Sequence, residues 1–359
     1  MNHKLKILTI IGARPQFIKA AALSRVLRNY SQIQEILVHT GQHHDASMSD
    51  VFFEEMQITK PKFNLEISGL SHGAMTGRMM EKIEEVLITE KPNWVLLYGD
   101  TNSTLAGALA AAKLHIPIAH VEAGLRSYNM RMPEEINRVL TDRISTLLFC
   151  PTDSAVKNLK SEGVQAGIVR TGDVMADALF YYQTVAAEKA KQFTKVPVGK
   201  FALATIHRAE NTDDSSRLRN IFGALEELNQ ELPVYLPLHP RTKGKLKELG
   251  IIPKIKVIDP IGYFDMLQLL THSSLVLTDS GGVQKEAYLC QKPCVTFRDE
   301  TEWIELVEHG VNKLVGTSQE SIVKAAHSFL SKSISFPQDL YGNGKAAEQI
   351  VQTILDFKV

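Results

Sequence analysis

Residues 94–113 read WVLLYGDTNSTLAGALAAAK, and they are the clearest indication of the fold class. Its first five residues are an apolar run that predicts a buried strand ending at Gly99-Asp100. The alanine-rich residues 103–113 predict a helix, and a serine or threonine at its start suits a helix cap. An apolar strand that passes at once into a helix is typical of a parallel sheet covered by helices on both faces. The stretch therefore predicts an α/β fold.

The same alternation of strand, loop and helix runs along the chain and restarts near its middle. Apolar runs predict strands at residues 5–11, 35–39, 94–98, 116–121 and 147–150, and again at 201–206, 234–238, 275–278 and 293–297. Helices are predicted at 17–27, 215–228 and 345–357. A chain of 359 residues is too long for one ordinary core. We therefore predict two Rossmann-like, doubly wound domains, 1–171 and 172–344.

Composition excludes several classes of protein. Lys+Arg and Asp+Glu are balanced at 40 each, so we expect no nucleic-acid partner. Three cysteines without a CxxC motif fit a reducing compartment. We find no signal peptide and no apolar stretch of the roughly 20 residues that a membrane span needs. The expectation is a cytoplasmic protein with no membrane partner.

Polar clusters follow nearly every predicted strand in both halves. In open parallel sheets, ligands bind beyond the carboxyl ends of the strands. Polar groups at these ends, repeated in the two halves, therefore predict an active site in an interdomain cleft.

Two of these strand ends suit a phosphate. Arg14 lies in the turn after residues 5–11, where a helix begins and a guanidinium adds donors. In DSGGVQKE, residues 279–286, Ser280 offers a hydroxyl, and glycines let the backbone approach an anion. Glu286 lies further along that helix, where it could accept hydrogen bonds from ribose hydroxyls. The alternatives are a helix-entry turn with a solvated arginine and an ordinary glycine-rich turn.

Acids and histidines form the other clusters. Carboxylates in a cleft serve as general acid or base when their surroundings shift their pKa, and the candidates are Asp100, Glu122, Glu134 and Glu135. The alternative is structural, because aspartate caps helices and glutamate favours their first turn. Basic groups that could neutralise a diphosphate or pass a proton end two strands of the second half: His207, Arg208, His239 and Arg241. Their alternative is solvated loops.

No cofactor is expected. GxGxxG, the NAD fingerprint, occurs nowhere in the chain. His43-His44-Asp45 could suggest a metal, but adjacent histidines seldom share an ion and no third ligand has metal spacing. We therefore predict no metal site.

Eight motifs in order resemble the non-hydrolysing UDP-N-acetylglucosamine 2-epimerases: GARPQFIKAA, TGQHHD, GDTNSTLAGALAA, HVEAGLRS, MPEEINR, IHRAEN, LHPRT and DSGGVQKEA. The resemblance runs from about residue 5 to the C-terminus. It implies a GT-B-like fold, in which two Rossmann-like domains flank a cleft and residues 345–359 pack back on the first domain. It also implies a homodimer.

The resemblance implies roles for matching positions. The diphosphate would be held by Arg14, His207, Ser280 and the backbone of Gly281 and Gly282, with His239 and Arg241 in the same UDP-binding set. Glu286 would hold the ribose, and the loop with Pro260, Ile261 and Phe264 would hold uracil. The sugar would lie among Lys19, Asp100, Glu122 and Glu134, with Arg138 nearby. Lys19, Asp100, Glu122, Glu134 and His207 would be the catalytic set.

The implied reaction inverts the sugar at C2 by eliminating UDP and adding it back. No carbonyl group adjoins C2, so the C2 proton is not acidic. The anomeric bond therefore breaks first, and a base then removes that proton. UDP must stay bound while it is the leaving group, and acids must serve both faces of the ring. Which acid is the base stays open.

Residues 127–132 read SYNMRM, a shorter loop than the Ser-Pro-Trp version of ordinary family members. With GARPQFIKA and TGQHHD, it looks like the branch acting on UDP-2,3-diacetamido-2,3-dideoxy-D-glucuronate for surface polysaccharide (O-antigen). Arg131 is then a candidate partner for the uronate carboxylate. The alternatives are conversion of UDP-N-acetylglucosamine to UDP-ManNAc, a GT-B glycosyltransferase, and a non-catalytic nucleotide-sugar sensor.

Overall fold

The computed structural model describes residues 4–42, 59–189 and 196–357, apart from the side chains of Arg14 and of residues 186–189. His43, His44 and Asp45 lie outside the described residues. The chain divides into two compact units, one of residues 1–180 with 339–359 and one of residues 181–338. The domain limits predicted from the sequence, 1–171 with 345–359 and 172–344, stay a prediction beside this division.

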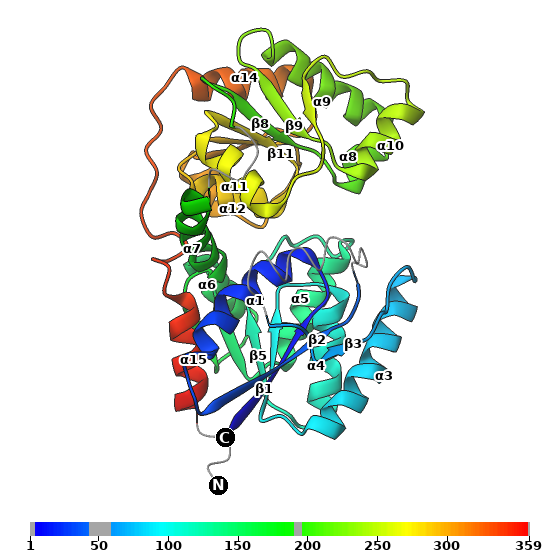
Figure 1. Ribbon diagram of the computed structural model, residues 1–359, viewed down its shortest axis with the longest axis vertical. Helices are drawn as coiled ribbons and strands as arrows, with labels where there is room; N and C mark the ends of the chain where they lie inside the picture. Colours follow the sequence, from blue (N-terminus) through cyan, green and yellow to red (C-terminus); the bar gives the residue numbers. More distant parts are fainter. Residues whose placement is uncertain (1–3, 43–58, 190–195, 358–359) are drawn as a thin grey trace. The chain divides into compact units, whose positions relative to one another are not determined.

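The first unit is built on a parallel sheet with the strand order β3-β2-β1-β4-β5-β6-β7 (Figure 1). Its strands are β1 (Leu5–Ile11), β2 (Ile33–His39), β3 (Phe63–Asn64), β4 (Trp94–Tyr98), β5 (Ile118–Val121), β6 (Leu147–Cys150) and β7 (Ile168–Arg170). Its helices are α1 (Arg14–Leu27), α3 (His72–Glu90), α4 (Asn102–Lys113), α5 (Pro133–Ile144), α6 (Asp153–Ser161), the start of α7 (Val174–Lys189), and α15 (Ala346–Asp356).

Strand β4 and helix α4 form as the opening stretch predicts. All five residues of β4 are buried, because its sheet is covered on both faces. The N-cap of α4 is Thr101, whose hydroxyl accepts a hydrogen bond from the Thr104 amide. A Thr cap leaves the preceding Asp100 carboxylate available for other contacts.

Helix α15 completes the first unit. The Asp177 carboxylate in α7 accepts hydrogen bonds from the amides of Ala346 and Ala347 at 3.1 and 2.7 Å, which satisfies the start of α15. Its far end is fixed by an edge-on contact between Phe357 and Trp94, with ring centroids 5.3 Å apart. The red helix therefore lies beside α1 in Figure 1.

The second unit repeats the design with a parallel sheet of order β10-β9-β8-β11-β12-β13. Its strands are β8 (Ala202–Thr205), β9 (Val234–Pro237), β10 (Lys256–Ile258), β11 (Leu275–Thr278), β12 (Cys294–Thr296) and β13 (Asn312–Leu314). Its helices are the end of α7, α8 (Ala209–Thr212), α9 (Ser215–Leu228), α10 (Pro240–Glu248), α11 (Tyr263–His272), α12 (Gly281–Leu289), α13 (Ile304–Glu308) and α14 (Gln319–Leu330).

Each sheet reverses its strand order at one point, between β1 and β4 in the first unit and between β8 and β11 in the second. Beyond the carboxyl ends of such strands the loops run in opposite directions and leave room for a ligand. The two reversal points therefore single out the segments after these four strands.

Candidate active site

The loop after β1 is fixed to the end of β4. Gln16 makes this link: its Oε1 accepts from the amides of Gly12 and Ala13 at 2.7 and 3.0 Å, and its Nε2 donates to the Tyr98 carbonyl at 2.8 Å. Gly12 is required, because a Cβ there would collide with the hydroxyls of Ser103 and Thr40. Arg14 begins α1 from this loop, and its side chain lies outside the described part of the structure.

Lys19 and Glu122 form a buried ion pair at this reversal point. Their side chains are 9% and 7% exposed, and the ammonium contacts the Glu122 carboxylate directly. Glu122 has φ 70°, a left-handed conformation that costs a non-glycine residue about 1–3 kcal/mol. Gly99 sits against the pair, since a Cβ there would lie 3.3 Å from Glu122 Oε2 and 3.4 Å from Lys19 Nζ. Two sequence-predicted residues, one on helix α1 and one just after strand β5, are thus brought together.

Asp100 and Arg138 form a second predicted pair. The Arg138 guanidinium contacts the carboxylates of both Asp100 and Glu135. Glu135 in turn accepts from the Ser127 amide and hydroxyl at 3.0 Å each, and from the Tyr128 amide at 2.9 Å. The sequence predicted Glu135 only as a candidate general acid or base, and its pairing with Arg138 was missed. Its i, i+3 spacing from Arg138 on one helix was the available signal.

Glu134 and Arg131 are placed differently. Both are exposed, Glu134 in the first turn of α5 and Arg131 in the loop before it. The backbone amide of Arg131 donates to Asn129 Oδ1 at 3.1 Å, which shapes the loop tip. These two side chains therefore remain accessible to a ligand at the surface of the first unit.

Asp279 organises the reversal point of the second unit. Its buried carboxylate accepts from the amides of His207 and Arg208 at 3.1 Å and from Asn211 Nδ2 at 3.2 Å. His207 Nδ1 lies 3.3 Å from the same carboxylate. Burial alone would raise the pKa of Asp279, but the His207 hydrogen bond and charge and the two amide donors outweigh it and lower the pKa. Asp279 therefore fixes the orientation of His207, a role that was not predicted from the sequence.

Helix α12 begins next to this carboxylate. Ser280 is the N-cap, and its Oγ accepts from the Val283 amide at 3.5 Å. At Gly281 a Cβ would lie 2.7 Å from Glu302 Oε1, so a side chain there would require the Glu302 carboxylate to shift. At Gly282 the space is open, with Ser280 Oγ the nearest atom at 4.0 Å. A helix start with small residues suits an anion.

His239 stands beside His207, with ring centroids 5.8 Å apart. His239 caps α10 and its Nδ1 accepts from the Arg241 amide at 3.2 Å. The Arg241 side chain turns to α8, where it donates to Thr212 Oγ1 at 2.9 Å and pairs with Asp213 at 2.6 Å. The two histidines thus form one cluster, while Arg241 is engaged elsewhere in the described structure.

The loop before α11 combines exposed and buried residues. Pro260 is exposed and Ile261 is half-buried, whereas Phe264 is 1% exposed and packs edge-on against Tyr182, with centroids 5.5 Å apart. Glu286 is buried near Tyr263, whose pKa is raised by burial and then by the charge of Glu286. The Phe264 ring supports the loop from inside the unit.

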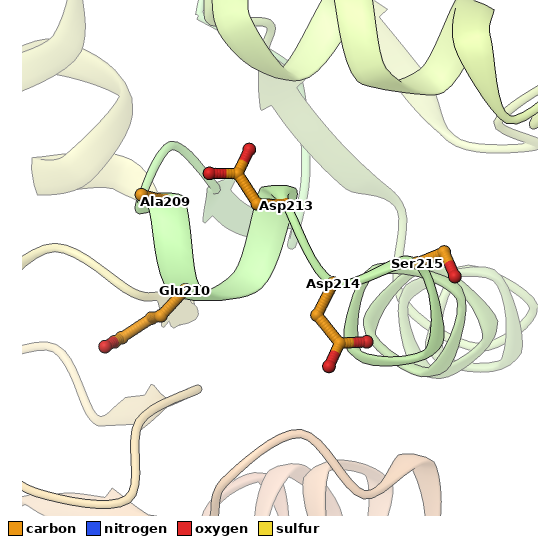
Figure 2. A pocket seen from close by; sticks show the side chains of 5 residues that line it. All are labelled: Ala209, Glu210, Asp213, Asp214 and Ser215. Atoms are coloured by element: carbon orange, nitrogen blue, oxygen red, sulfur yellow. The ribbon is translucent and has the colours of Figure 1, made fainter.

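A surface hollow of about 600 Å³ lies beside α8, lined by Ala209, Glu210, Asp213, Asp214 and Ser215 (Figure 2). Its three carboxylates would repel a diphosphate, so we do not assign it to the candidate site. Among the described residues no group of three or more His, Cys, Asp or Glu side chains is arranged to hold a metal ion. Within the same part of the chain, no helix has the length and apolar character to cross a bilayer.

Comparison with known proteins identifies the family. The family model described as UDP-N-acetylglucosamine 2-epimerase matches residues 25–355. The UDP-2,3-diacetamido-2,3-dideoxy-D-glucuronate 2-epimerase of Pseudomonas aeruginosa PAO1 is 56% identical, over 97% of this chain and 99% of that protein.

Solved structures agree. The Methanocaldococcus jannaschii UDP-GlcNAc 2-epimerase in complex with UDP-GlcNAc and UDP has a TM-score of 0.91 and 43% identity, over 98% of this chain and 99% of that one. The Neisseria meningitidis UDP-GlcNAc 2-epimerase bound to UDP-GlcNAc has a TM-score of 0.89 and 32% identity, over 98% and 100%. The predicted α/β, GT-B-like fold is confirmed. This chain therefore belongs to the UDP-N-acetylglucosamine 2-epimerase family, whose members are isomerases acting on UDP-sugars.

Proposed function

We propose that the protein interconverts UDP-2,3-diacetamido-2,3-dideoxy-D-glucuronate and its C2 epimer. The observation that supports this substrate is the similarity to the P. aeruginosa enzyme, which is 56% identical over nearly the full length of both chains. The M. jannaschii enzyme at 43% identity is named for the neutral sugar, so UDP-N-acetylglucosamine is the second candidate.

The second unit holds UDP in this proposal. His207, fixed by Asp279, and the start of α12 at Ser280 provide donors for the diphosphate, and both strengthen as charge develops on the leaving group. The remaining proposed contacts are Arg14, His239, Arg241, Gly281 and Gly282 for the diphosphate, Glu286 for the ribose, and Pro260, Ile261 and Phe264 for uracil.

The first unit supplies the groups for the chemistry at C2. The C1–O bond breaks with its electron pair leaving on UDP, a carboxylate takes the C2 proton, and a glycal results. UDP then adds back at C1 while C2 accepts a proton on the opposite face. The proposed set is Lys19, Asp100, Glu122 and Glu134, with Arg138 holding Asp100. The Lys19–Glu122 pair and the Arg138–Asp100 pair support it, because Glu122 and Asp100 each have a cationic neighbour.

Proton NMR of the purified protein in D2O tests this function. With each UDP-sugar separately, the expected result is a second epimer and loss of the C2 proton signal, faster for the diacetamido uronate than for UDP-N-acetylglucosamine. Faster reaction of the neutral sugar would replace the substrate assignment. A glycosyltransferase would show turnover only with an acceptor. Tight UDP binding without deuterium uptake at C2 would indicate a non-catalytic nucleotide-sugar sensor instead.

Arg131 is the proposed partner of the C6 carboxylate. It is exposed at the tip of the loop anchored by Glu135, so its guanidinium is available to a charged sugar.

We further propose that the protein is a cytoplasmic homodimer whose product enters surface polysaccharide such as O-antigen. Exposed apolar side chains on α3 and α5, namely Met80, Ile88, Ile136 and Leu140, support a protein interface on the first unit.

A further inference from the structure

His120 lies in the middle of β5 and has no exposed surface. Its Nε2 is 2.7 Å from the carbonyl oxygen of Gly99, and its Nδ1 is 2.7 Å from Asp142 Oδ1. The imidazole therefore connects the end of β4 to helix α5. None of the roles discussed above uses it.

Both neighbours of the ring are acceptors. A carbonyl oxygen has no proton to give, and the other oxygen of Asp142 already accepts from the Gly124 amide at 3.0 Å and from Arg126 Nη1 at 2.7 Å. A neutral imidazole carries one N–H and would leave one of the two 2.7 Å contacts without a proton.

The charges around Asp142 favour its ionised form. Burial alone would raise the pKa of Asp142, but the hydrogen bond and charge of His120, and then the charge of Arg126, outweigh burial and lower it. Arg126 also pairs with Glu162 through two contacts of 2.7 Å. The buried Asp142 carboxylate thus lies between the His120 ring and the Arg126 guanidinium, and a buried carboxylate needs such partners.

We infer that His120 is a buried imidazolium that positions the turn carrying Asp100 by donating to the Gly99 carbonyl. The role rests on the proposed function, because it matters only if Asp100 and Glu122 serve the sugar.

Gly99 transmits the effect. Its amide donates to the Val121 carbonyl at 3.0 Å and its carbonyl accepts from His120, so β5 holds both polar groups of this residue. Gly99 also packs against the Lys19–Glu122 pair. A shift of this turn would move Asp100, which follows it, and would loosen the contact with the ion pair. His120 is a positioning residue and need not touch the substrate.

Nitrogen-15 NMR of the native protein without substrate tests the protonation state directly. We expect both ring nitrogens of His120 to have the shifts of protonated nitrogen. Asp142→Asn supplies an amide that donates to Nδ1, so in that variant Nδ1 should take the shift of an unprotonated nitrogen. An unprotonated ring nitrogen in the native protein would overturn the inference, whatever the enzyme's substrate.

Two variants of His120 test the positioning. The amide nitrogen of His120→Gln reaches the place of Nε2 and keeps the bond to Gly99, whereas that of His120→Asn reaches the place of Nδ1 and keeps the bond to Asp142. We expect His120→Asn to lower kcat by about 10²-fold, since misplaced groups cost rate of that order, and His120→Gln to lower it less. KM and the affinity for UDP should stay near those of the native protein.

His115→Asn is the matched control, because His115 is exposed in the turn before β5. It should retain native kcat. Equal kcat losses in the two His120 variants, or native kcat in both, would contradict the positioning role. If native protein binds UDP but shows no C2 exchange, the proposed function fails, and the NMR result for the ring still stands. If the variants do not fold, the native spectrum decides.

Discussion

Glu122 holds its carboxylate against Lys19 from a left-handed backbone position that few residue types adopt. Exchange to Gln keeps the side-chain shape but removes the charge. We expect Glu122→Gln to lower the rate of C2 deuterium exchange by about 10²–10⁴-fold, the range for loss of a general acid or base, with UDP affinity retained. Exchange rates by NMR and UDP titration calorimetry measure the two effects.

Glu66→Gln is the control for that change, because Glu66 has a similar φ of 54° but is exposed. It should leave the exchange rate as it is. If Glu122→Gln exchanged deuterium at the native rate, Glu122 would have no part in the chemistry.

Arg131→Met tests substrate choice at one residue. Loss of the guanidinium removes the attraction to a C6 carboxylate but nothing that a neutral sugar needs. We expect kcat/KM to fall by about tenfold for the diacetamido uronate, and to change little for UDP-N-acetylglucosamine, as for loss of an ion pair worth about 1.4 kcal/mol. Steady-state assays with both nucleotides measure this, and equal losses would remove Arg131 from the proposal.

The sequence predicted which residues stand at strand ends but not which side chains contact one another. Glu122 was predicted from its place at a strand end, whereas Lys19 was predicted only from the family resemblance. Glu135, Asp279 and His120 were missed as organising residues, because their roles depend on hydrogen bonds between segments far apart in the chain. A carboxylate that anchors a loop looks in a sequence like one that reacts.

At the scale of elements, strong apolar runs gave the most accurate bounds. Strands β4 and β11 and helix α9 have the predicted limits. Helix α1 begins at Arg14, three residues before the predicted start, because Pro15 suits a first turn and Gln16 bonds the amides before it. No element was predicted for residues 72–90, although α3 buries Met75, Met79 and Ile83 at helical spacing.

The Asp177 cap of α15 predicts a pH effect on stability. Burial raises the pKa of Asp177 to about 6 from 3.8, against the opposing Ala347 and Ala346 amides. The folded protein therefore favours the protonated form of Asp177. The contribution of this shift to the free energy of unfolding is full below pH 3.8 and is lost as the pH rises through 6. The shift is worth about 3 kcal/mol. Urea unfolding should show this fall between pH 4 and 7, and Asp177→Asn should lack it.

Asp153→Asn provides the comparison, since the Asp153 side chain is 94% exposed in the first turn of α6. It should keep the native pH dependence. An Asp177→Asn variant with the same slope as the native protein would show that Asp177 does not titrate on unfolding in this range.

Across the full chain, the two units share one sheet arrangement, a parallel sheet whose strand order reverses once, but they differ in their polar groups. The first has acids and their cationic partners at its reversal point, and the second has histidines and a helix start. The α/β class and the two-part sheet pattern followed from the sequence, because apolar runs restart after residue 200. The polar strand ends of both halves predicted a shared site, and the resemblance predicted which half holds UDP and which holds the sugar.

The proposed homodimer predicts a change in assembly. Ile136 and Leu140 are 39% and 46% exposed on one helix, α5, and a lysine at both positions would place two charges in an apolar interface. Light scattering should give twice the chain mass of 40.0 kDa for the native protein and a shift toward 40.0 kDa for Ile136→Lys/Leu140→Lys. Ile252→Lys, at an 82% exposed site of the second unit, should not shift. An unaltered mass in the double variant would place any interface elsewhere.

The contact between Asp177 and α15 also has a consequence for biosynthesis. The ribosome makes residues 181–338 between these two segments. The surface of the amino-terminal unit that binds this helix therefore stays uncovered until the entire intervening unit has been translated. Chains stalled before residue 346 would present that apolar surface to chaperones and proteases, however well their second unit had folded.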